Sequence, residues 1–234
     1  MAVLPGRRAP IGSRQKKPGG ADADTVAGGG AGATAISGRL LPAMLDERRL
    51  ATIGTLNILD FGRANSASLE FFNQFSCRLC VLDAAEPLLG WSRHLAERGD
   101  EPPSVAQMQL ELSNLLSSIG DYRYDLVFLW DTLNQLPEPA LPAFARLLRR
   151  HVTADFRGHG FMLHKRGTAQ ELRQLGLTGR DRIAIHDARE APLYAHNRRA
   201  IDEALGRELA IDQGVLHGDG RLEFLMIRGS TSPS

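Results

Sequence analysis

Two short apolar runs, separated by a stretch with helical spacing, lie in the first half of the chain. The first run, residues 56–59, ends on Asp60, and the second, residues 79–82, ends on Asp83. Runs with so few polar positions are typical of strands that are covered on both faces of a parallel sheet. We therefore predict a strand-helix-strand unit with an acid at the end of each strand. The apolar positions of its helix are Leu69, Phe72 and Phe75.

The turn after the first strand is rich in small residues. Gly62 permits the chain to fold back over the sheet, and Ser66 or Ser68 can cap the helix that follows. A helix N-terminus can receive a negatively charged group, and an acid after the second strand can bind two ribose hydroxyls. This combination is typical of nucleotide-binding domains.

These residues resemble motifs I and II of the class I S-adenosylmethionine-dependent methyltransferases. In that family an acid closes the first strand, a G-x-G-x-G turn follows, and a second acid holds the ribose. Asp60 separates the pattern from that of nicotinamide-dependent oxidoreductases, whose first strand normally runs into its glycines without an acid. The three glycine places here hold one glycine and two other small residues. The resemblance implies S-adenosylmethionine as the cofactor, bound by Asp60, Gly62, Ala64, Ser66, Asp83, Ala84, Glu111, Asn114 and Asp131.

The similarity continues in order as far as residue 164. Residues 124–139 are similar to the fourth strand of the family and the loop after it, with Asp131 following Trp130 at the strand end. The resemblance implies a Rossmann-like α/β fold: a three-layer sandwich with a mostly parallel seven-stranded sheet and an antiparallel C-terminal hairpin. The sequence predicts the remaining strands at residues 106–112 and 159–164, the hairpin at 209–216 and 221–228, and helices at 87–98 and 141–150.

Three further segments are assigned from their patterns. Residues 39–50 predict an amphipathic helix that either flanks the cofactor or simply covers the sheet edge. Residues 168–175 begin with a capping-box pattern and predict a helix, and residues 197–205 predict another that stops at Gly206. Residues 183–197 are extra relative to the shortest members of the family, in which such insertions often build the acceptor pocket.

The chain divides into a domain at residues 39–229 and two tails. Residues 1–38 are rich in Gly, Ala and Pro and have no large apolar cluster, so we expect them to be disordered. Their early lack of acids would also suit an organelle transit peptide, although the preference for arginine over lysine favours a bacterial protein. Residues 230–234 are expected to be a free tail.

The composition of the chain limits which binding partners and which cell compartment we expect. A net charge of +1 gives no reason to expect nucleic acid or an anionic membrane. No apolar run approaches the ~18 to 20 residues needed to cross a bilayer. The N-terminal residues lack a compact apolar core followed by a cleavage site, so we do not expect secretion. Cys77 and Cys80 are three positions apart on one expected strand and point to opposite faces, so we expect free thiols and no metal site. We expect a cytoplasmic protein.

Methyl transfer depends chiefly on positioning, with a base required only if the acceptor begins protonated. Asp131 and His164 are the candidate catalytic residues, and His159 is a further candidate base. The strand end at residue 130 lacks the N/D-P-P-Y sequence of amino methyltransferases that act on nucleic acids and protein glutamine. We therefore expect a small-molecule acceptor. The alternative is a catalytically inactive methyltransferase-like protein that binds a protein partner, which the reduced glycine content of the turn supports.

Overall fold

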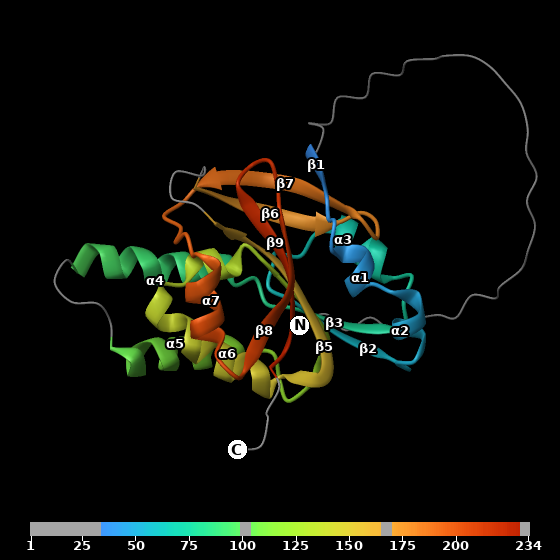
Figure 1. Cartoon of the computed structure of the whole chain (residues 1–234), viewed down its shortest axis with the longest axis horizontal. Helices are drawn as coiled ribbons and strands as arrows, with labels where there is room; N and C mark the ends of the chain where they lie inside the picture. The colour runs from blue at the N-terminus through green and yellow to red at the C-terminus, as the bar shows by residue number, and fades with distance from the viewer. Residues whose placement is uncertain (1–33, 99–103, 165–169, 230–234) are drawn as a thin grey trace, which may run out of the picture.

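The structure, a computed structural model, describes residues 34–98, 104–164 and 170–229, which form a three-layer α/β arrangement (Figure 1). The middle layer is a six-stranded sheet with the strand order β3-β2-β4-β5-β9-β8. Its first four strands in that order are parallel, whereas β9 is antiparallel to both of its neighbours. The strands are β2 (Leu56–Asp60), β3 (Cys77–Val81), β4 (Tyr124–Trp130), β5 (Val152–Leu163), β8 (Leu209–Leu216) and β9 (Arg221–Arg228). The expected α/β class with an antiparallel C-terminal hairpin is confirmed.

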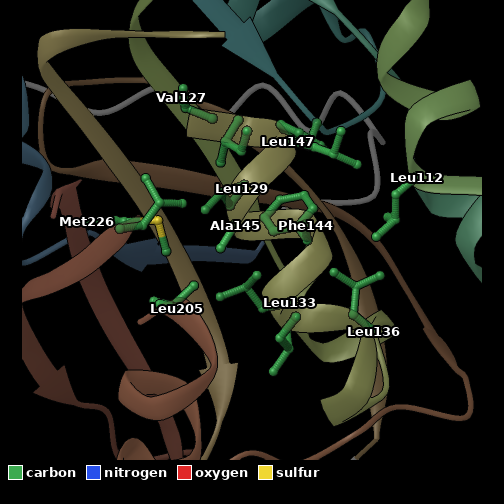
Figure 2. Close-up of a cluster of buried hydrophobic side chains, with 14 of the residues drawn as sticks. Leu112, Val127, Leu129, Leu133, Leu136, Phe144, Ala145, Leu147, Leu205 and Met226 are labelled. Atoms are coloured by element: carbon green, nitrogen blue, oxygen red, sulfur yellow. The ribbon is translucent and has the colours of Figure 1, made fainter. Parts of the chain in front are cut away.

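Two hydrophobic clusters lie on opposite faces of this sheet. Val127 and Leu129 of β4 belong to one cluster and Leu126 and Phe128 to the other, as the two-residue period of a strand requires. Figure 2 shows the first cluster, in which Phe144 and its neighbours pack against Val127 and Leu129. The helices of that face are α4 (Ala85–Arg98), α5 (Val105–Ser117), α6 (Leu141–Arg150) and α7 (Arg198–Leu205); those of the other are α1 (Leu41–Met44), α2 (Glu47–Ala51) and α3 (Ser66–Phe72).

Local signals explain two helices, α6 and α7, whose ends were predicted to within one residue. α6 buries Leu141, Phe144 and Leu148 on one side, and its last turn carries arginines, which suit the negative end of a helix dipole. α7 begins where the Asn197 side chain accepts a hydrogen bond from the Ala200 N–H, and it ends at Gly206, whose φ of 58° suits glycine. Two short 3-10 helices, η1 (Thr132–Gln135) and η2 (Glu138–Ala140), connect β4 to α6.

A second, three-stranded sheet lies against the carboxyl ends of the parallel strands. It contains β1 (Thr34–Ser37), β7 (Arg182–Glu190) and β6 (Glu171–Leu177), in that order and all antiparallel. Ser68 of α3 accepts a hydrogen bond from the Leu177 N–H at 3.0 Å, and the side chain of Asn65 donates to the Leu175 carbonyl at 3.4 Å. Both contacts join β6 to the start of α3, so the small sheet covers the first turn of that helix.

The expected strand at residues 106–112 is wrong, because this segment belongs to α5. Ser104 and Gln107 form a capping box at its start, and Met108, Leu112 and Leu116 recur at helical spacing on its buried side. The main sheet therefore has six strands, whereas seven were predicted.

The expected helix at residues 168–175 is also wrong. Residues 171–177 form β6, which is bonded along its length to β7, and the first residues of the predicted helix lie outside the described residues. Leu172 and Leu175 have a spacing that suits a helix, but Arg173, Leu175 and Leu177 are all buried in the strand. Pairing with a strand later in the chain therefore overrides the local capping pattern.

The N-terminal boundary needs two corrections. Residues 34–37, assigned to a disordered tail, form β1, which pairs with residues 182–185 of β7. The single helix expected at residues 39–50 is two short helices, because Asp46 leaves the helix and caps α2 through the Arg49 N–H. The rest of the N-terminal tail, residues 1–33, and the C-terminal residues 230–234 lie outside the described residues.

A buried carboxylate holds the start of α1 against the sheet. Glu223 of β9 accepts hydrogen bonds from the backbone N–H groups of Arg39 and Leu40 and from the rings of His159 and His217, at 2.7 to 2.9 Å. Burial by itself raises the pKa of a carboxyl, but the hydrogen bonds and charges of these partners bring the pKa of Glu223 to about 2. Four donors thus converge on one side chain that is wholly shielded from water.

We expect Glu223→Gln to lower the free energy of unfolding by about 2 to 4 kcal/mol at pH 7, because an amide cannot accept from all four donors. The ordinary pKa of this carboxyl is 4.5 and its folded value is about 2, so its contribution is present above pH 4.5. The difference between variant and wild type should therefore shrink as the pH falls from 4.5 towards 2. Urea unfolding followed by circular dichroism measures both effects.

The matched control is Glu203→Gln, which alters an exposed pair with Arg199 on α7. It should change the free energy of unfolding by less than about 0.5 kcal/mol. Equal effects of the two substitutions would contradict a structural role for the buried carboxylate.

Candidate functional site

The carboxyl ends of β2, β3 and β4 meet at a cavity of about 220 Å³, which the small sheet closes from the other side. In open α/β sheets ligands bind at this edge. The main-sheet side contributes Phe61, Gly62, Arg63, Asp83, Ala85, Glu86, Trp130, Asp131, Thr132 and Gln135, and the small sheet contributes Leu172, Arg173, Gln174, Leu175, Asp187 and Arg189.

Asp60 shapes the turn behind this cavity. Its Oδ1 accepts hydrogen bonds from the Gly62 N–H at 2.7 Å and from the indole Nε1–H of Trp130 at 2.6 Å. Burial raises the pKa of Asp60 to about 6, although the two hydrogen bonds act in the opposite direction. The acid that closes the first strand therefore joins the turn after β2 to the end of β4.

Gly62 is required by its contact with Trp130. A Cβ atom added at Gly62 would lie 2.8 Å from both Cδ1 and Nε1 of the indole, a separation that real side chains do not tolerate. The structural reason for the one glycine of the motif is thus the close approach of a tryptophan.

Backbone strain is concentrated at the same edge of the sheet. Asp83, with φ of 47°, and Trp130, with φ of 48°, are the two non-glycine residues with positive φ in the part of the chain that the structure describes. Both line the cavity. Such conformations cost about 1 to 3 kcal/mol each and cluster at ligand-binding and switch regions. The strain therefore marks this cavity as the candidate site independently of any motif.

Asp83 lies at the mouth of the cavity with its side chain 45% exposed. It pairs with Arg63, whose Nε is 3.9 Å from Asp83 Oδ2, and the Arg63 side chain is itself largely exposed. This is a loose pair at the limit of an ion-pair distance, so Asp83 keeps most of its capacity to accept hydrogen bonds from a ligand. Ala84, which was also predicted to bind the cofactor, is fully buried and is not among the lining residues, and its N–H donates to the Phe61 carbonyl.

The small residues of the turn lie outside the cavity. Ala64 and Ser66 are exposed and are not among its lining residues. The helix cap is neither of the serines that the sequence suggested: Asn65 accepts from the Ser68 N–H at 2.8 Å, and the Ser68 hydroxyl contacts β6.

Asp131 is held by a buried arginine that the sequence analysis did not identify. Arg173 of β6 donates to both carboxylate oxygens of Asp131, from Nε at 2.9 Å and from an Nη at 2.8 Å. Burial lowers the pKa of Arg173, but the charge of Asp131 more than offsets this and the pKa is raised. Both oxygens of the Asp131 carboxylate are therefore engaged by this arginine, and the side chain is poorly placed to act as a base. An arginine between Leu172 and Leu175 is the signal in the sequence that such a partner exists.

The other residues predicted for the site do not reach it. Glu111 and Asn114 are exposed on α5, and His164 follows β5 outside the cavity lining. His159 is fully buried in the hydrogen-bond network of Glu223. The sequence analysis in turn missed Arg63, Glu86, Thr132, Gln174 and Arg189, all of which line the cavity.

The segment at residues 183–197, expected to be an insertion near the acceptor, contributes Asp187 and Arg189 to the cavity wall. Arg189 pairs with Glu86 of α4 and so joins β7 to the main domain. The rest of the segment is fixed against the loop after β4, because the Tyr194 N–H donates to the Asn134 carbonyl at 2.6 Å.

Cys77 and Cys80 are free thiols, half-buried on opposite faces of β3, as expected. Within the described residues no group of three His, Cys, Asp or Glu side chains is placed to hold a metal ion. Over the same part of the chain no helix is long and apolar enough to span a membrane.

No protein-family model matches the chain, and no curated protein matches it by sequence. Solved structures with a similar fold include methyltransferases. One is a S-adenosylmethionine-dependent methyltransferase from Clostridium acetobutylicum ATCC 824, at 12% identity and a TM-score of 0.49, covering 83% of this chain and 93% of the other. Another is the 1,6-didemethyltoxoflavin-N1-methyltransferase of Burkholderia thailandensis with bound S-adenosylhomocysteine, at 14% identity and a TM-score of 0.42, covering 82% and 78%. Similarities at this level assign neither a cofactor nor a reaction to this chain.

Proposed function

We propose that this chain binds S-adenosylmethionine in the cavity between the two sheets and transfers its methyl group to a small polar acceptor. The observation that carries the proposal is the meeting of Gly62, Asp83 and Trp130 at one cavity, with Asp60 directly behind it. These are the strand ends where the sequence resemblance places the cofactor, and the strained backbone of the described residues is found at the same place.

The residues present fit such a cofactor in part. Asp83 is half-exposed and only loosely paired, which suits a carboxylate that binds two ribose hydroxyls. Asp60 is buried one step behind the turn, where its charge would attract the amino group of such a ligand. Bound S-adenosylmethionine would supply an activated methyl group on a sulfonium centre. The chain itself would orient the two substrates and exclude water.

The acceptor would contact the small-sheet side of the cavity. Gln174 and Asp187 are cross-strand neighbours on β6 and β7, and both line the cavity. Asp131 is occupied by Arg173, so proton removal would depend on Asp187 or on an acceptor that arrives unprotonated. Positioning would then be the main contribution of the protein to the rate.

A second function, that of a catalytically inactive binding protein, is favoured by one observation. The indole of Trp130 packs directly on Gly62, and Ala64 and Ser66 have no contact with the cavity. Under this alternative the turn would serve the fold alone and would bind no cofactor.

Titration calorimetry with S-adenosylmethionine and S-adenosylhomocysteine separates the two functions. We expect saturable binding of both ligands to the wild-type protein. Lack of binding at millimolar ligand would reject the enzyme and leave the binding protein.

Asp83→Asn tests the ribose contact. Asparagine tolerates positive φ as well as aspartate does, so this substitution removes the charge without adding backbone strain. We expect about a tenfold loss of affinity for S-adenosylhomocysteine, because a hydrogen bond to a charged group is worth ~1.5 to 3 kcal/mol. The control is Asp212→Asn on the exposed surface of β8, which should leave the affinity unchanged. Equal affinities for the two variants would count against the assignment of Asp83.

Ala64→Leu tests whether the cofactor passes the turn. Ala64 is exposed, so the fold should tolerate the larger side chain with a change of less than about 0.5 kcal/mol in unfolding free energy. If the methionine part of the cofactor lies against this backbone, the leucine side chain should abolish binding by steric overlap. Unaltered calorimetric binding by a folded variant would show that the ligand does not lie against the backbone of residue 64.

A further inference from the structure

We infer that the cavity selects for positively charged ligands and that Asp187 of the small sheet is the residue that determines this specificity. The site therefore favours S-adenosylmethionine, whose sulfonium is a cation, over the product S-adenosylhomocysteine, whose thioether is neutral. The inference deepens the proposed function and rests on it, because it concerns the cofactor and the product of the same site.

The first step is the balance of charge on the cavity wall. Each arginine that lines the cavity is paired with an acid that also lines it: Arg63 with Asp83, Arg173 with Asp131 and Arg189 with Glu86. Asp187 is a further acid of the lining. Within the described residues its carboxylate has neither a hydrogen bond nor an ion pair. One negative charge on the wall is therefore left without a partner.

The second step is how Asp187 comes to face the cavity. Gln174 of β6 is the partner of Asp187 in β7, but the next residue, Leu175, is the partner of Ile185, so β7 contains an extra residue at His186. Bulges of this kind re-aim a side chain and are frequent next to active sites. Asp187 and Gln174 line the cavity, whereas His186 is not among the lining residues. The irregular pairing thus presents the acid, and not the adjacent histidine, to the site.

The third step is that the effect does not depend on how the ligand is oriented. Methyl transfer inside the cavity requires the sulfonium to lie inside it, wherever the nucleoside and the amino-acid part are placed. A cavity of about 220 Å³ is only ~8 Å across, within the ~8 to 10 Å over which physiological salt screens a charge. The Asp187 carboxylate therefore attracts the sulfonium from any position that permits the reaction. The product has lost that charge, so it is held less firmly than the cofactor.

Asp60 adds negative charge behind the wall, but its replacement would not isolate the effect of charge. Its carboxylate is bonded to the Gly62 N–H and to the indole of Trp130, so a substitution there would alter the turn as well. Asp187 is exposed and has no such bonds within the described residues. Replacing Asp187 by asparagine consequently changes the charge of the site and leaves the packing in place.

Titration calorimetry with S-adenosylmethionine and S-adenosylhomocysteine on wild type and Asp187→Asn tests the inference. We expect the wild type to bind the cofactor more tightly than the product. Asp187→Asn should reduce this preference by about threefold to tenfold, as expected for one charge acting over several ångströms in a partly hydrated site. The additional methyl group of the cofactor contributes equally in both proteins, so the change in the ratio of affinities reports the charge alone.

The matched control is Glu190→Gln. Glu190 is an exposed acid three positions further along β7, so it lies on the opposite face of the strand, and it is not among the lining residues. We expect this substitution to leave the ratio of the two affinities within about twofold of wild type, because the charge it removes faces away from the cavity.

Ionic strength provides a second readout that needs no variant. Raising the salt concentration from about 0.01 M to about 0.1 M shortens the screening length from about 30 Å to about 10 Å. The preference of the wild type for S-adenosylmethionine should therefore fall over this range. It should fall less in Asp187→Asn, and the wild-type measurement decides the matter if that variant does not fold.

The outcomes distinguish the inference from the proposed function. A preference for the cofactor that falls with salt and is reduced in Asp187→Asn, but not in Glu190→Gln, supports the role of Asp187. Binding of both ligands without such a preference, or with an equal change in the two variants, overturns that role and leaves the proposed function in place. Failure of the wild type to bind either ligand at millimolar concentration rejects the proposed function, and the inference with it.

Discussion

The buried pair between Asp131 and Arg173 is the contact on which the candidate site depends. Asp131 ends β4 of the main sheet, and Arg173 is the third residue of β6 in the small sheet, so one bidentate ion pair joins the two sheets across the cavity. Arg173 also lies over the ring of Phe161 and 3.7 Å from Asp219. Removing either partner would leave a charge buried without compensation, which is far more costly than the pair itself is stabilising. The pair therefore sets where the small sheet sits.

Glu223 fixes the position of the N-terminal segment, as the ion pair between Asp131 and Arg173 fixes the position of the small sheet. Its carboxylate accepts from the first backbone N–H groups of the α1 region and from two histidine rings, and so connects a segment before the first parallel strand to the last strand of the chain. Both groups of buried charged residues, the Asp131–Arg173 pair and Glu223 with its partners, hold parts of the structure that bury too little apolar area to be held by it alone. Asp131 and His159, which were candidate catalytic residues, are each bonded to a buried partner and so have a structural role.

In the turn after β2, Gly62 matches the glycine of a cofactor-binding motif, but packing within the protein is a sufficient reason for a glycine there. Glycine at residue 62 is consistent with a cofactor that approaches the backbone, but the neighbour that requires it in this structure is the indole of Trp130. Asp60 is likewise bonded to that indole and to the turn itself. A pattern of acids and glycines thus identifies where a nucleotide site belongs in this fold, while the groups that face the site are set by packing between β2 and β4.

The sequence by itself determined the elements whose signals are local. The strand-helix-strand unit around Asp60 and Asp83, helix α6, helix α7 with its stop at Gly206, and the C-terminal hairpin all follow from periodicity and turn residues within a few positions of one another. These are the interactions that a short segment makes with itself.

Tertiary structure alone decided the rest, because the deciding partners are far apart in the chain. Residues 171–177 have spacing that suits a helix, and only pairing with β7 makes them a strand. Residues 34–37 have too little apolar surface to order alone, and they become β1 through the backbone of residues 182–185, about 150 positions later. Asp131 is separated from Arg173 by 42 positions, and Trp130 from Asp60 by 70. Side-chain partners at such separations leave no periodic trace in the sequence, so the lining of the site could be known only once the two sheets were in contact.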